Sequence, residues 1–144
     1  MQLDDLYRQV IMDHYKNPRN KGKFEEGAIT VDLNNPTCGD KISLQLKVNN
    51  GVVEDARYTG DGCSISMSSA SMMTAAVKGK TLEQAKDMIA RFSELMLGKD
   101  VRFDDYEDIE ALSGVNKFPA RIKCATLSWN ALRKVIDEEQ FNKL

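Results

Sequence analysis

The sequence predicts an α+β fold, in which a small antiparallel three-stranded sheet carries helices packed on one face. Between residues 29 and 59, apolar and polar residues alternate in three short runs, as they do in strands that bury one face. Before and after that region, apolar residues instead recur at intervals of three and four, which is typical of amphipathic helices. Because the strands cluster in one stretch of the chain, we expect them to pair with one another.

Composition and charge limit the possible classes of function. The chain has 144 residues, 42% hydrophobic and 29% charged, which is typical of one globular domain spanning residues 1–144. The net charge of −2, without a basic stripe, argues against binding to nucleic acid. No apolar run approaches the ~20 residues of a membrane span, and the acidic N-terminus lacks an apolar signal core. We therefore expect a cytoplasmic protein with no membrane partner.

The chain is expected to open with an amphipathic helix. The helix ends at Asn17-Pro18, because the residue before a proline is biased away from the helical conformation. A polar loop follows. We interpret His14, the single histidine, as a packed or hydrogen-bonded residue rather than a ligand. The apolar positions of the helix recur at helical spacing: Leu3, Leu6, Tyr7, Val10, Ile11 and His14.

Three strands are expected next, over residues 29–33, 42–48 and 52–59. The Asn49-Asn50-Gly51 sequence is a turn signal, so the last two strands form a β-hairpin. With the turn centred on Asn50, residue 48 would face residue 52, and residue 38 would fall opposite about residue 62. The loops that carry Cys38 and Cys63 would then leave the same end of the hairpin.

Two helices are expected after the hairpin. The first covers residues 64–77, and its small residues would let another element approach closely. Thr81 and Gln84 fit a capping box at the start of the second helix, which Gly98 ends. Its apolar face comprises Leu82, Ala85, Met88, Ile89, Phe92 and Leu95. We interpret the following methionines as core filling: Met67, Met72, Met73, Met88 and Met96.

The acidic segment over residues 99–116 is expected to be a solvated surface loop with a short helix. A last helix begins near Pro119, a residue favoured in the first helical turn. Its apolar face comprises Phe118, Ile122, Ala125, Trp129, Leu132 and Ile136.

The three cysteines are the candidate functional residues. In a chain without an export signal they favour metal binding or catalysis over disulfides. Asp40 lies two residues after Cys38, so both side chains would share one side of an extended segment, with Gly39 leaving room for a ligand. Cys124 falls in the first turns of the last helix, whose N-terminus would stabilise a thiolate. If that helix meets the hairpin end, Cys38, Asp40, Cys63 and Cys124 converge.

Such a set suits tetrahedral zinc, although thiolates also bind iron–sulfur clusters, so the residues alone leave the metal open. A lone cysteine is more often a small buried side chain, but the glycine-flanked settings of Cys38 and Cys63 argue against that interpretation. Asp40 taken alone would be a turn residue. Arg121 and Lys123 flank Cys124 and would offset the charge of the site, or else form an ordinary solvated helix face.

Four motifs resemble those of the IscU-like (NifU N-terminal) family. They are DHYKNP at residues 13–18, NPTCGD at residues 35–40, GDGCSISMSSAS at residues 60–71 and FPARIKC at residues 118–124. The family's scaffold proteins carry a histidine before the third cysteine, where this chain has Lys123, and a proline-rich stretch of which only Pro119 remains. With the acidic segment as an insertion, the chain is most similar to the SufU branch of the family.

The resemblance implies the IscU-like fold and a zinc ion bound by Cys38, Asp40, Cys63 and Cys124. It also implies a sulfurtransferase that accepts persulfide sulfur on Cys38 from a SufS-like cysteine desulfurase, with downstream Suf assembly proteins as further partners. Our mechanistic hypothesis is ligand exchange, in which Cys38 leaves the zinc before it attacks the persulfide. The alternatives are a scaffold for a transient [2Fe–2S] cluster and a purely structural zinc module.

Overall fold

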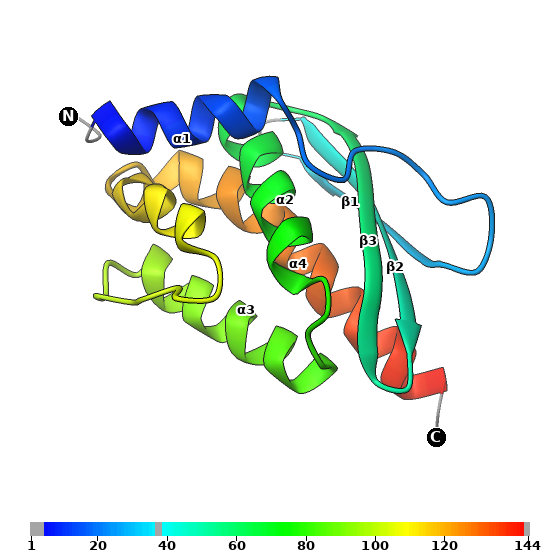
Figure 1. Ribbon diagram of the computed structural model, residues 1–144. Coiled ribbons are helices and arrows are strands. Elements are labelled where there is room, and N and C mark those ends of the chain that lie inside the picture. The colour runs from blue at the N-terminus through cyan, green and yellow to red at the C-terminus, as the bar shows by residue number, and fades with distance from the viewer. Residues whose placement is uncertain (1–4, 37–38, 143–144) are drawn as a thin grey trace.

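The computed structural model describes residues 5–36 and 39–142 and places the helices on one side of a small sheet (Figure 1). Leu3 and Cys38 therefore lie outside the described residues. None of the described helices is long and apolar enough to span a membrane. The elements in chain order are α1 (Asp5–Lys16), β1 (Ile29–Asn35), β2 (Asp40–Asn49), β3 (Val52–Asp61), α2 (Ser64–Val77), α3 (Leu82–Met96), the 3₁₀ helix η1 (Glu107–Lys117) and α4 (Pro119–Asn142).

The sheet has the order β1-β2-β3, and both pairs of neighbouring strands are antiparallel. Alternate residues of β2, among them Leu44 and Leu46, are fully buried beneath the helices, whereas Lys41 on the opposite face is exposed. Helices α2 and α4 cover the buried face. The predicted α+β class and the three-stranded antiparallel sheet are confirmed.

The register of the β2–β3 hairpin differs from the prediction by two residues. Asn50 and Gly51 both have positive φ, 54° and 75°, and form a two-residue turn that pairs Asn49 with Val52. A bulge between Lys47 and Val48 then shifts the pairing by one more residue. Next to the turn the shift is one residue, so Val53 rather than Val52 lies opposite Val48 and is buried. Beyond the bulge the shift is two, so the side chains there keep their predicted faces.

The strands also continue further than predicted, and Gly60 does not break β3. It pairs with Ile42 inside the sheet, where a Cβ atom at residue 60 would collide with the backbone carbonyl of Lys41. Both strands therefore reach the open end of the hairpin, away from the turn, where Lys41 lies opposite Asp61. This end is called the hairpin end below.

Helix α2 is the central helix, as Figure 1 shows, and it begins and ends where the sequence predicts. It packs against α1, α4 and β3 and is buried around almost its whole circumference. Such burial requires small side chains and satisfied polar groups. The Ser69 hydroxyl, for example, donates to the Ala125 carbonyl at 2.7 Å and accepts from the Trp129 indole at 3.1 Å.

The predictions for α3 and α4 are confirmed with one exception. The capping box of Thr81 and Gln84 is present, and the Phe92 ring stacks on the Trp129 indole with centroids 4.6 Å apart. Phe118 was assigned to the apolar face of α4 but is 41% exposed. It precedes the first residue of the helix, so the helical periodicity does not extend to it.

The acidic segment forms a loop and a short helix, η1, as predicted. Its assignment as a solvated surface segment is wrong for its apolar residues, which are part of the core. Phe103, Ile109 and Leu112 are fully buried against the rest of the helical layer. The acidic residues between them hold the segment in place, because Asp105 pairs with Arg91 at 3.1 Å and Asp108 with His14 at 2.8 Å. The prediction relied on the negative charge of the segment and did not take into account the apolar residues, which face the core.

His14 joins three elements, which confirms its interpretation as a packed, hydrogen-bonded residue. It is 0% exposed, with Nδ1 2.7 Å from the Ser71 hydroxyl and Nε2 2.8 Å from the Asp108 carboxylate. Burial lowers the pKa of His14 and so favours the neutral ring, despite the opposing hydrogen bond to Asp108. Because a carboxylate can only accept, the neutral ring carries its proton on Nε2, and Nδ1 accepts from the Ser71 hydroxyl.

Truncation in η1 tests whether the acidic segment is structural. Ile109→Ala removes a fully buried side chain and should lower the free energy of unfolding by about 2–5 kcal/mol. Asp104→Ala, at an exposed position of the same segment, should change it by less than about 0.5 kcal/mol. Chemical denaturation of both variants measures the difference. Equal midpoints for both would show that the segment does not contribute to the core.

Candidate metal centre

Three of the predicted site residues lie together, although they come from three separate elements. Asp40 begins β2, Cys63 immediately precedes α2, and Cys124 lies in the second turn of α4. Their potential ligand atoms all lie within 4.8 Å of one another, so this group could hold a metal ion. Asp40 and Cys124 are 4% and 3% exposed, and Cys63 is half-buried. Cys38 lies outside the described residues.

The hairpin end brings Asp40 next to Cys63. Because Lys41 pairs with Asp61, the next residues along the two strands, Asp40 and Gly62, meet as well. A Cβ atom at residue 62 would lie 2.9 Å from the Asp40 Cγ and 2.5 Å from the Ser66 hydroxyl oxygen. A side chain at residue 62 would therefore push Asp40 or Ser66 aside, whereas glycine lets the carboxylate and the thiol approach each other.

Cys63 occupies the N-cap position of α2, with an extended backbone at φ −72° and ψ 170°. Its Sγ lies 3.8 Å from the Asp40 Oδ2 and 3.7 Å from the Ser66 Oγ. No side chain caps the helix from this position. The unpaired N–H groups of the first turn and the helix dipole therefore favour negative charge at this sulfur.

Cys124 is held in place by the packing of α4 on α2. Its Sγ lies 3.8 Å from the carbonyl oxygen of Ala120, one turn earlier in the helix. The next residue, Ala125, accepts the hydrogen bond from Ser69 of α2 at 2.7 Å. This buried bond fixes the turn that carries Cys124 against the helix that follows Cys63.

The donor set suits zinc. With Zn–S bonds of about 2.3 Å and Zn–O bonds of about 2.0–2.2 Å, a sulfur and an oxygen ligand of a tetrahedral site lie roughly 3.5–3.7 Å apart. The 3.8 Å between the Cys63 sulfur and the Asp40 oxygen is slightly longer than that. Two thiols and one carboxylate supply three of the four ligands of such a site. The assignment of these residues as ligands stays a prediction.

Arg121 and Lys123 lie on exposed positions of α4, on either side of Ile122. Within the described part of the chain, neither forms an ion pair. Their proposed compensation of the charge of the site stays a prediction.

Sequence reasoning missed two residues of the site, Gly62 and Ser66. Gly62 was treated only as a residue that breaks the strand, whereas it allows the approach of Asp40. Ser66 lies one helical turn after Cys63, and its hydroxyl oxygen is 3.7 Å from the Cys63 sulfur. The signal for Ser66 was available, because residues three apart share one face of a helix.

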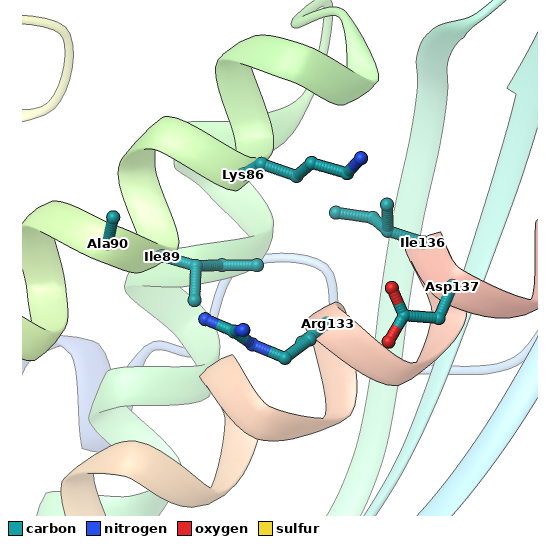
Figure 2. Close-up of a pocket in the computed structure, with 6 residues that line it drawn as sticks. All are labelled: Lys86, Ile89, Ala90, Arg133, Ile136 and Asp137. Carbon is teal, nitrogen blue, oxygen red and sulfur yellow. The ribbon is translucent and has the colours of Figure 1, made fainter. Parts of the chain in front are cut away.

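A separate groove of about 280 Å³ lies between α3 and α4 (Figure 2). Figure 2 shows Lys86 and Ile89 of α3 facing Arg133, Ile136 and Asp137 of α4 across it. None of the described residues that line it carries a thiol or an imidazole. Arg133 follows Cys124 by nine residues on the same helix, or roughly 13 Å along the axis. The groove is therefore distinct from the site formed by Asp40, Cys63 and Cys124.

The chain belongs to the NifU-like N-terminal domain family, whose model matches residues 6–138. It is 62% identical to the zinc-dependent sulfurtransferase SufU of Bacillus subtilis, over 96% of this chain and 94% of that protein. It is also 47% identical to the iron–sulfur cluster assembly scaffold protein IscU of Streptococcus pyogenes, over 93% of this chain and 84% of that protein. The family resemblance seen in the motifs is confirmed.

Solved structures share the fold. A crystal structure of a hypothetical protein superposes with a TM-score of 0.87 at 46% identity, covering 94% of this chain and 99% of the other. A putative iron–sulfur cluster assembly scaffold protein for the SUF system, from Fervidobacterium islandicum, gives a TM-score of 0.83 at 30% identity. It covers 89% of this chain and 94% of its own. The arrangement of sheet and helices is therefore that of the family.

Gly62→Ala tests the close approach at the hairpin end. The added methyl group should displace the Asp40 carboxylate from Cys63 and sharply reduce zinc retention after dialysis, measured as zinc per chain. Gly79→Ala is the matched control, because a Cβ atom there meets nothing within 4 Å. Its φ of +80° should cost on the order of 1 kcal/mol of stability without loss of zinc. Full zinc retention by Gly62→Ala would contradict the described geometry.

Proposed function

We propose that this protein is a zinc-dependent sulfurtransferase, which accepts persulfide sulfur from a cysteine desulfurase for iron–sulfur cluster assembly. The convergence of Asp40, Cys63 and Cys124 carries the proposal, because these residues offer two thiols and a carboxylate that could hold a metal ion. The Bacillus subtilis relative, 62% identical, bears the name of that activity. The expected compartment is the cytoplasm, where thiols stay reduced.

The proposed ligands are Cys38, Asp40, Cys63 and Cys124. A bound zinc ion would keep the thiols deprotonated at neutral pH and join the hairpin to the two helices. Asp40 and Cys124 are buried and held by the strand register and by helix packing, so they form the fixed part of the site. A zinc-bound group of this kind also explains why a small domain buries a carboxylate beside two thiols.

Cys38 is the proposed sulfur acceptor. Its thiolate attacks the terminal sulfur of the desulfurase persulfide and forms a new S–S bond. The S–S bond of the donor breaks, and the desulfurase cysteine leaves as a thiolate. The persulfide on Cys38 is then passed to downstream Suf assembly proteins or reduced by a thiol. Gly39, next to Cys38, has a φ of +76°, a backbone conformation that glycine adopts readily, and a Cβ atom added there would meet none of the described residues beyond its chain neighbours within 4 Å. Both features support a pivot beside the acceptor.

The second candidate function is a scaffold for a transient [2Fe–2S] cluster. Thiolates suit such a cluster as well as zinc, and the Streptococcus pyogenes relative is named as a scaffold. Lys123 weakens this candidate, because the residue before the third cysteine cannot act as an imidazole ligand. We therefore place sulfur transfer first.

Desulfurase turnover distinguishes the two functions. With a reductant and a SufS-like cysteine desulfurase, the zinc-loaded protein should raise the rate of sulfide release. Cys38→Ala should abolish that stimulation while the desulfurase still forms its own persulfide. Mass spectrometry should find the additional sulfur on Cys38 and on neither Cys63 nor Cys124. If iron-loaded, zinc-free protein stimulates the desulfurase equally, the scaffold function replaces the proposed one.

Asp40→Ala tests the oxygen ligand. Loss of the carboxylate should weaken zinc binding by more than about 10-fold, since even residues that only support a ligand change metal affinity by that much. Asp61→Ala is the matched control, because Asp61 is an exposed aspartate at the adjacent end of β3. Competition with a chromophoric chelator measures both affinities. Unchanged zinc affinity of Asp40→Ala would show that Asp40 is not a ligand, and would favour the alternative that it is a turn residue.

A further inference from the structure

Ser66 lies directly behind Cys63. It is 2% exposed, and its hydroxyl oxygen is 3.7 Å from the Cys63 sulfur, one turn into α2. The space at Gly62 brings the same hydroxyl close to Asp40, because a Cβ atom at residue 62 would contact both side chains. Ser66 therefore occupies the interior side of the group formed by the carboxylate and the thiol.

The Ser66 hydroxyl can change its hydrogen-bond acceptor without leaving a buried group unpaired. It now donates to the Cys63 carbonyl oxygen at 3.1 Å. That oxygen also accepts from the backbone N–H of Met67 at 3.0 Å. If the hydroxyl proton turns toward the sulfur, the carbonyl keeps its helical partner and pays no desolvation penalty.

Binding of a metal to the Cys63 sulfur, 3.7 Å from the Ser66 hydroxyl oxygen, would decide which way a hydrogen bond between the two side chains runs. As a thiol, Cys63 donates toward the Asp40 carboxylate or the Ser66 oxygen, at 3.8 and 3.7 Å. As a metal-bound thiolate it has no proton and can only accept. The nearby hydroxyl then becomes its donor, and a hydrogen bond to a charged acceptor is stronger than one to a neutral acceptor.

We propose that Ser66 is a positioning residue, which donates a hydrogen bond to the metal-bound thiolate of Cys63 and keeps that thiolate on the metal. This inference rests on the proposed zinc site. The hydrogen bond withdraws electron density from the sulfur and lowers its nucleophilicity. It therefore makes Cys63 a fixed ligand and leaves sulfur acceptance to a different cysteine.

The other buried serines of α2 do not share this position. Ser68 donates to the carbonyl oxygens of Ser64 and Ile65, at 2.5 and 3.3 Å, within its own helix. Ser69 and Ser71 bond to Ala125 and His14. Ser66→Ala and Ser68→Ala are thus matched variants, because each removes one buried hydroxyl from the same helix and leaves alanine, a strong helix former.

The test is zinc affinity by chelator competition on the full chain. Ser66→Ala should bind zinc about 10-fold or more weakly, as expected for loss of a group that supports a ligand. Ser68→Ala should match the unmodified protein. In cobalt-substituted protein, Ser66→Ala alone should move the thiolate-to-cobalt charge-transfer band to lower energy, because the sulfur lone pair loses its hydrogen bond. A merely structural role would not move that band.

The outcomes separate this inference from the proposed function. If the unmodified protein binds zinc but the two variants share its affinity and band position, Ser66 does not support the ligand and the inference fails alone. If both variants bind zinc equally more weakly and the charge-transfer band does not move, the effect comes from helix packing. That result would also overturn the inference. If the unmodified protein retains no zinc, the proposed function fails, and the inference that rests on it fails with it.

Discussion

The close approach of the two strands at the end of the hairpin is the constraint on which the site depends. Asp40 and Gly62 meet there because Lys41 pairs with Asp61, and the missing side chain of Gly62 lets the carboxylate lie 3.8 Å from the Cys63 sulfur. The register that produces this meeting is set at the other end of the hairpin, by the Asn50-Gly51 turn and the bulge after Lys47. A local choice of turn therefore decides a contact about nine residues away along each strand.

Helix α2 carries that contact into the helical layer. It starts directly after Cys63, and its buried serines bond outward to its neighbours: Ser69 to α4, which carries Cys124, and Ser71 to His14 of α1. The acidic segment completes the same network through Asp108 on His14. Such buried polar bonds are costly to leave unmade, so they fix the position of each helix. The candidate metal site is therefore positioned by the packing of the helices as well as by the chain segments that carry its residues.

Much of this arrangement could be predicted from sequence, and the failures share a physical cause. The alternation in residues 42–48 and the capping box at Thr81 are local signals, and both gave the right element. Periodicity records neither the type of turn and the bulge that set the hairpin register, nor the first residue of α4 that leaves Phe118 exposed, nor the distant contacts that bury one face of the acidic segment. The site was predictable as a set of residue types, but Gly62 and Ser66 gain their roles only from the approach of Asp40.

The metal environment tests the central claim most directly. X-ray absorption at the zinc edge of anaerobically purified protein reports the elements and distances around the ion. With Cys38, Asp40, Cys63 and Cys124 as ligands, the spectrum should fit three sulfur atoms at about 2.3 Å and one oxygen at about 2.0–2.2 Å. A zinc shell dominated by oxygen and nitrogen, or purified protein that carries iron and sulfide in place of zinc, would contradict the account.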